Sequence, residues 1–203
     1  MVRETAYDEV HHAQQHFRSL LNSLAYPGTI RHLEPVEVTP PPSLTPSSVL
    51  LAFALLNADV SFHLVDFGQQ SADYLAANTR ASAAAITQAA FVFAKGETLP
   101  ERLEGINCGS LLYPDTAATL VLQVAQLSPA PLAGGLKLEL EGPGVKGVAN
   151  AYVRGLNADL LLAVQARNAE FPLGIDTFLT SDDDGRPSAL GIPRSVKVAW
   201  EHC

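Results

Sequence analysis

The short segment Phe171–Asp176, which reads Phe-Pro-Leu-Gly-Ile-Asp, constrains the backbone more than any other part of this sequence. Pro172 fixes its own φ and moves the residue before it out of the helical region, whereas Gly174 can adopt conformations closed to other residues. The apolar run 175–179 begins inside this segment and predicts a strand. We therefore expect a tight corner, with the Asp176 carboxylate at the head of the strand, where loops carry function.

A second rigid elbow, Ile192-Pro193-Arg194, precedes another predicted strand. The two elbows could face each other across a hairpin, so that Asp176 and Arg194 meet. The structural interpretation is that the elbows hold the hairpin in register, with an ion pair or hydrogen bonds to the backbone. The functional interpretation is an anion-binding or protein-contact site with Arg194 at its rim. We favour the structural interpretation and assign no catalytic residue.

The length of the chain favours one domain spanning residues 1–203. Hydrophobic residues make up 47% of the chain and charged residues 17%, which is typical of a folded globular protein. There are 13 basic and 21 acidic residues, with a formal net charge of −8 and no run of lysines or arginines. A nucleic acid partner is not expected, because phosphate binding needs a clustered basic face.

Cysteine usage and hydropathy indicate the compartment. Cys108 and Cys203 are too few for a disulfide scaffold and form no zinc-binding spacing. The N-terminus has no apolar signal core, and the longest apolar run, Val49–Leu56, is far short of the ~20 residues that span a bilayer. We expect a cytoplasmic protein outside the membrane, and the motifs predict neither a metal nor a cofactor.

The clearest predicted helix covers Glu9–Ala25, where apolar residues recur every three or four positions. Asp8 can cap its first turn, and Pro27-Gly28 can end it. A short strand is predicted at 29–38. A proline-rich loop then leads to Thr45-Pro46, which should open a buried helix running to Asn57.

The remainder alternates short apolar runs with helical patterns, which predicts an α/β layered domain with antiparallel hairpins near the C-terminus. A hairpin turn is expected at 181–186. The further predicted strands are 60–65, 90–94, 119–124 and 136–140, and the further predicted helices are 71–87, with a break near Asn78, 99–107 and 156–169.

The segment Gly142–Gly147 matches the GxGxxG pattern by which dinucleotide-binding folds bring the backbone close to a pyrophosphate. That fingerprint normally opens a βαβ unit, whereas this segment lies late in the chain and contains a proline. A glycine-rich turn between two strands is the favoured interpretation.

His12 and His16 lie one helical turn apart, with Asp8 one turn before them, so the three side chains could share a face and bind a divalent metal. No second pair of ligands is apparent elsewhere in the sequence. A solvated polar helix face is therefore the favoured interpretation.

Four segments in this order resemble the PhnH family, the H subunit of the bacterial carbon-phosphorus lyase system, along nearly the whole chain. They are the helix His12–Leu21 ending in Pro27-Gly28, the strand Ala118–Val124, the corner Phe171–Asp176 and the elbow Ile192–Arg194. The resemblance implies a role in phosphonate catabolism, in which an alkylphosphonate displaces adenine from ATP to form ribose 1-methylphosphonate 5-triphosphate before the carbon-phosphorus bond is broken.

The resemblance also implies a mainly structural role in a core complex with the G, I and J subunits, and a homodimer. The implied fold is a three-layer α/β/α arrangement with a mixed sheet, similar to pyridoxal-phosphate-dependent transferases but without the cofactor site. The competing hypothesis is a stand-alone enzyme that binds a nucleotide or phosphonate at the Arg194 elbow and the Gly142–Gly147 turn.

Overall fold

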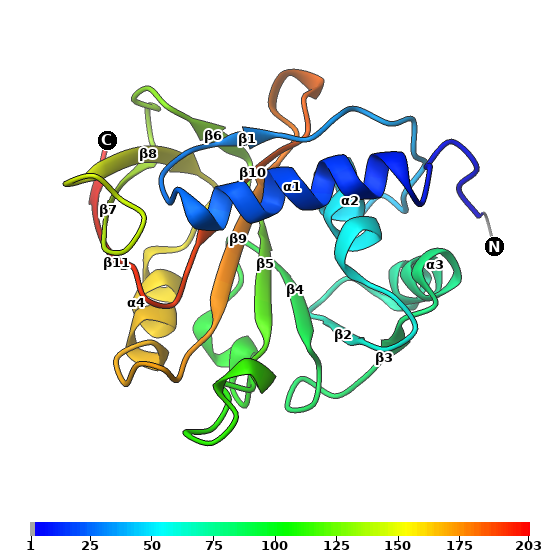
Figure 1. Ribbon diagram of the computed structural model, residues 1–203. Coiled ribbons are helices and arrows are strands. Elements are labelled where there is room, and N and C mark those ends of the chain that lie inside the picture. The colour runs from blue at the N-terminus through cyan, green and yellow to red at the C-terminus, as the bar shows by residue number, and fades with distance from the viewer. Residues whose placement is uncertain (1–2) are drawn as a thin grey trace.

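A mixed seven-stranded sheet forms the centre of the protein (Figure 1). The computed structural model describes residues 3–203, with the backbone alone at Asp184. The sheet is parallel from β9 to β3, and β10 and β1 add to it in the antiparallel sense. In spatial order its strands are β1 (Arg31–His32), β10 (Ser188–Ile192), β9 (Asp176–Ser181), β5 (Thr119–Gln123), β4 (Phe91–Lys95), β2 (Ser61–Leu64) and β3 (Ser82–Ala83).

Three helices, α1 (His11–Ala25), α2 (Pro46–Leu55) and α3 (Gln69–Thr79), cover one face of this sheet (Figure 1). Thr45 caps α2 by accepting a hydrogen bond from the backbone of Ser48, and a proline occupies the first helical position, as the sequence predicted. The apolar layer under the helices includes Phe62, Phe93, Val121 and Phe178 of the sheet with Leu20, Leu50, Leu51 and Leu75 of the helices.

The other face is covered by helix α4 (Ala158–Arg167) and by a second, antiparallel sheet. The second sheet has the order β11 (Lys197–His202), β7 (Leu136–Glu141), β8 (Ala149–Arg154) and β6 (Gln126–Ser128). Alternate residues Leu138 and Leu140 of β7 are fully buried against the central sheet, whereas the charged residues between them face outward. Three 3-10 turns complete the fold: η1 (Pro100–Leu103), η2 (Pro114–Thr116) and η3 (Asp183–Gly185).

The α/β class and the mixed sheet are confirmed, and so are helices α1, α2 and α4 and the predicted strands that became β2, β4, β5 and β7. The hairpin turn at 181–186 joins the antiparallel strands β9 and β10. The strand predicted at 29–38 is wrong in length, since only Arg31–His32 pair with the sheet. The helix predicted at 99–107 is a single 3-10 turn, η1.

The helix predicted at 71–87 ends at Thr79, close to the expected break. Arg80 takes a left-handed conformation with φ of 66° and ends the helix. The chain then pairs with β2, and the backbone of Ala84 donates to the carbonyl of Phe62. Pairing with an existing strand therefore outweighs the helix propensity of the alanines.

His16 fixes α1 to the rest of the protein, and the prediction of a solvated helix face is wrong for this residue. Its side chain is fully buried. Nε2 lies 3.0 Å from the Glu34 carbonyl and Nδ1 lies 3.3 Å from the Tyr7 hydroxyl. A carbonyl only accepts, so Nε2 carries the proton and Nδ1 accepts from Tyr7. Among residues 3–203, no three His, Cys, Asp or Glu side chains are grouped to hold a metal.

Burial lowers the pKa of His16, so the folded protein binds a proton here less readily than the unfolded chain does. The contribution of His16 to the free energy of unfolding should be fully present above the ordinary imidazole pKa of about 6.5. It should decrease as the pH falls below that value. We expect His16→Gln to flatten the dependence of the free energy of unfolding on pH between about pH 7.5 and pH 5, measured by urea denaturation. Gln15→Ala, at an exposed position of the same helix, is the control and should keep the wild-type slope. An unchanged slope in the His16 variant would contradict the assignment.

Candidate functional site

The amino ends of β5 and β9 lie side by side, because Thr119 of β5 is in register with Asp176 of β9. The loops that enter these parallel strands therefore meet at one edge of the sheet. In Figure 1 they are the green segment before β5 and the orange segment before β9, at the lower edge of the molecule. Every residue singled out in the corner Phe171–Asp176 lies at this edge.

Asp176 and Arg194 make the contact that the two elbows predicted. The Arg194 Nη2 lies 2.8 Å from Asp176 Oδ2, and the Arg194 backbone N–H donates to Oδ1 at 2.8 Å. The Arg194 Nη1 donates to the carbonyl of Pro114 at 2.9 Å. The two charged side chains are only 15% and 29% exposed. The ion pair thus joins the start of β9, the Pro193 elbow and the loop before β5.

The corner itself is anchored to the same loop. Gly174 has a φ of +124°, and a Cβ at this position would lie 2.3 Å from Asn168 Oδ1, so a larger residue would not fit. The backbone N–H of Gly174 donates to the carbonyl of Cys108 at 3.0 Å. The Phe171-Pro172 peptide is cis. A glycine at position 174 therefore lets the corner pack closely against Asn168 at the end of α4, and its backbone N–H ties the corner to the loop that contains Cys108.

The loop 107–118 closes on itself, since Ala118 donates to the carbonyl of Asn107. Within it, Ser110 and Tyr113 exchange backbone hydrogen bonds of 3.2 and 3.1 Å. Leu111 and Leu112 are consequently the two residues at the tip of a tight turn. Turn positions favour Gly, Asn, Asp or Ser, and neither leucine is buried: they are 75% and 83% exposed.

Two aromatic side chains of the same two adjoining loops are also exposed. Tyr113 is 63% exposed and Phe171, in the adjoining corner, is 68% exposed. We refer to Leu111, Leu112, Tyr113 and Phe171 as the apolar tip. Sequence reasoning found Phe171 but missed the other three, although the signal was a leucine pair between Ser110 and Pro114, where a turn would ordinarily be polar.

The Gly142–Gly147 segment is a turn between β7 and β8, as favoured from the sequence. A Cβ on Gly144 would lie 2.4 Å from the carbonyl of Ala25, and Gly142 packs against Ser195 and Val196. A strand follows the turn, so it presents no helix N-terminus to a pyrophosphate. The turn does border the Arg194 elbow, but that guanidinium already binds Asp176 and Pro114.

The carboxyl ends of β5 and β9 hold a polar network. Asp182, just after β9, accepts hydrogen bonds from the backbone and hydroxyl of Ser47 at 2.9 and 2.6 Å, so a carboxylate of the protein sits at the N-terminus of α2. Burial raises the pKa of Asp182. Gln123, the last residue of β5, binds the backbone of Thr45 and Ser43. In open α/β sheets this edge commonly binds ligands, and here the protein's own side chains occupy it.

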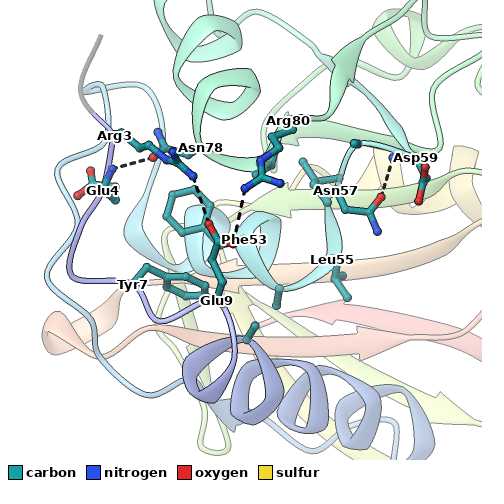
Figure 2. A pocket seen from close by; sticks show the side chains of 15 residues that line it. Arg3, Glu4, Tyr7, Glu9, Phe53, Leu55, Asn57, Asp59, Asn78 and Arg80 are labelled. Atoms are coloured by element: carbon teal, nitrogen blue, oxygen red, sulfur yellow. Dashed lines mark hydrogen bonds and ion pairs between the residues drawn. The ribbon is translucent and has the colours of Figure 1, made fainter.

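A pocket of about 400 Å3 lies between the N-terminal segment and the last turns of α2 and α3 (Figure 2). Arg3 and Arg80 point toward Glu9 from different segments, with N–O distances of 3.5 and 3.9 Å. Tyr7 and Phe53 form one wall, with their rings edge to face 5.0 Å apart. This site was missed from the sequence, because its residues come together only through tertiary folding.

Glu4 holds the N-terminal wall of that pocket. Its carboxylate accepts from the backbone N–H of Thr39 at 2.8 Å and from the Tyr74 hydroxyl at 2.7 Å. Burial alone would raise the pKa of Glu4, but these hydrogen bonds outweigh it and lower the pKa below its ordinary value. Glu4 is therefore a charged anchor for the segment that carries Arg3 and Tyr7.

Fold and site together define an α/β protein of mixed sheet topology that presents exposed apolar side chains at the amino edge of its central strands. Within residues 3–203, no helix combines the length and apolar character needed to cross a bilayer. The chain belongs to the PhnH family, since the family model described as bacterial phosphonate metabolism protein (PhnH) matches residues 5–199.

Two relatives match nearly the whole chain. The alpha-D-ribose 1-methylphosphonate 5-triphosphate synthase subunit PhnH of Rhizobium meliloti (strain 1021) is 34% identical over 96% of this chain and 94% of its own length. The putative C-P lyase subunit protein HtxG of Stutzerimonas stutzeri is 31% identical over 91% of this chain and 85% of its own length.

Removing the Asp176–Arg194 ion pair tests whether it holds the start of β9, the Pro193 elbow and the loop before β5 together. Arg194→Met removes three side-chain hydrogen bonds and leaves a half-buried carboxylate without its guanidinium partner, so we expect a loss of about 1–3 kcal/mol in the free energy of unfolding. Hydrogen exchange in residues 110–116 should become faster, because the contact with Pro114 is lost.

The control is Arg102→Met, which removes an ion pair with Asp66 whose side chains are 57% and 55% exposed. Exposed pairs contribute little, so urea denaturation should show no measurable change. Equal effects of the two substitutions would refute the role of Arg194 in holding the loop.

Proposed function

We propose that this protein is a subunit of the carbon-phosphorus lyase core complex of phosphonate catabolism. Its role is mainly structural, supporting formation of ribose 1-methylphosphonate 5-triphosphate from ATP and an alkylphosphonate. The observation that carries the proposal is the family match over residues 5–199, with two near-full-length relatives that are themselves named as subunits. The exposed and rigidly held apolar tip supports it, since large apolar side chains on a protein surface mark protein contacts.

The proposal also covers the partners of this protein, its oligomeric state, its compartment and its fold. The partners are the G, I and J subunits, the protein is a homodimer on its own, and it acts in the cytoplasm. Residues 1–203 form one domain whose fold is akin to that of pyridoxal-phosphate-dependent transferases without the cofactor site. The mixed sheet with three helices on one face supports the fold likeness. In this role the Asp176–Arg194 frame and the Phe171–Gly174 corner position a contact surface and have no catalytic duty.

Co-expression with the G, I and J subunits of the same organism tests the subunit role. We expect the four chains to elute together at fixed stoichiometry in size-exclusion chromatography with mass detection. The chain expressed alone should elute at the mass of a dimer. Elution of the co-expressed protein as a free species, separate from the other three subunits, would refute the proposal.

Small-molecule binding in the pocket of Figure 2 is a second candidate function, and one observation favours it. Two guanidinium groups from separate segments share the single carboxylate of Glu9, and all three side chains are more than 60% exposed. An anionic ligand could replace Glu9 between Arg3 and Arg80.

For this candidate, ATP or methylphosphonate should raise the thermal midpoint of the isolated protein, because a ligand that binds only the folded state stabilises it. The rise should disappear in Arg80→Gln and persist in the control Arg18→Gln, a substitution on the exposed side of α1. An unchanged midpoint of the wild-type protein with both compounds would exclude this pocket as their site.

A further inference from the structure

Neither burial in the core nor the geometry of the turn explains why large apolar residues occupy the tip. Leu111 and Leu112 are the tip residues of the Ser110–Tyr113 turn, and both are at least 75% exposed. A leucine in this position gives up its hydrophobic stabilisation, and its side chain contributes nothing to turn geometry. These residue types gain free energy only if something covers them.

The backbone of the tip is held by several hydrogen bonds within the chain. Ser110 and Tyr113 close the turn, Thr116 donates its hydroxyl to the carbonyl of Tyr113, and Arg194 holds Pro114. Phe171 is tied to the same loop through the hydrogen bond between Gly174 and Cys108. An ordered surface loses little conformational entropy on binding, which is the condition under which a small apolar anchor contributes most.

We infer that the apolar tip docks into an apolar groove on a different subunit of the phosphonate complex; this inference rests on the proposed function. The tip is convex, because it is a protruding two-residue turn at the lower edge of the molecule in Figure 1. A second copy of this chain is a poor partner for the tip, because it also carries a formal net charge of −8 and would bring like charge toward the exposed Asp115 and Glu170 beside the tip.

The charged residues beside the tip indicate which side chains should line the rim of the partner's groove. Asp115 follows the turn and Glu170 precedes Phe171 in the chain, and both are exposed. The whole chain carries a formal net charge of −8. The partner therefore has an apolar floor for the leucines and aromatic rings, with lysine or arginine side chains at its edge.

The test compares two double variants that each remove one leucine and one phenylalanine side chain. Leu112→Ser with Phe171→Ser alters the tip, and Phe17→Ser with Leu21→Ser alters the exposed side of α1, where the two side chains are 48% and 54% exposed. Each pair is co-expressed with the G, I and J subunits, and its thermal midpoint is measured alone to verify folding. Binding of the purified variant to a complex of G, I and J is then titrated.

We expect the tip variant to keep its thermal midpoint and to bind at least about tenfold more weakly than wild type, since a few central anchors supply most of the binding energy of an interface. The α1 variant should bind as wild type does. Asp115→Asn with Glu170→Gln should slow association at low salt and leave dissociation nearly unchanged.

A tip variant that binds as tightly as wild type would overturn the inference and leave the subunit role standing. Loss of binding in the α1 variant alone would also overturn it, because the interface would then lie on the helical face. Failure of the wild-type chain to bind the other subunits is a different result, which refutes the proposed function itself.

Discussion

The central strands β5, β9 and β10 are buried on both faces, and this requirement organises the rest of the chain. Successive residues of a strand point to opposite sides, so Val121 packs under the helices whereas Leu120 and Leu122 face the second sheet and α4. Each side then needs an apolar cover. Helices α1, α2 and α3 cover one face of the sheet. The other face is covered by α4 together with the four strands of the second sheet, where a three-layer α/β/α fold would have helices alone. Parallel pairing of β5 with β9 brings their entering loops together at one edge and their leaving loops together at the other.

The two edges are used differently. At the carboxyl edge, Asp182 satisfies the N-terminus of α2 and Gln123 satisfies the backbone beside it, so polar groups that could bind a ligand are bonded to one another. At the amino edge, Asp176 and Arg194 likewise bind each other, but here the pair lies behind an exposed apolar surface. The hydrogen bonds of Asp182 and Gln123 therefore occupy the carboxyl edge with the protein's own side chains, whereas the ion pair of Asp176 and Arg194 supports an exposed surface at the amino edge.

The sequence predicted those features that depend on local chemistry. The period of α1, the Thr45-Pro46 start of α2 and the elbows at 172–174 and 193 could be predicted because each is encoded within a few neighbouring residues. The second sheet could be predicted only in part: its strand β7 was predicted, whereas β8 was not, because β8 contains alanine and asparagine, which have low strand propensity, and is stabilised by pairing with β7 and β6. The contact of Asp176 with Arg194 was predicted from two rigid corners flanking one hairpin. The pocket of Figure 2 was beyond such reasoning, because it joins the N-terminal segment to the ends of two helices.

The size of the apolar tip limits what it can do alone. Covering a large apolar side chain contributes about 1.5–3 kcal/mol, so four of them contribute on the order of 6–12 kcal/mol before any cost is counted. Association costs roughly 4–15 kcal/mol in lost translational and rotational freedom. The tip by itself would therefore support at most a weak, transient contact, whereas a stable subunit interface buries at least about 1,200 Å2. A stable complex consequently requires further contact area around the tip, with the rigid frame of Asp176 and Arg194 presenting all of it in one orientation.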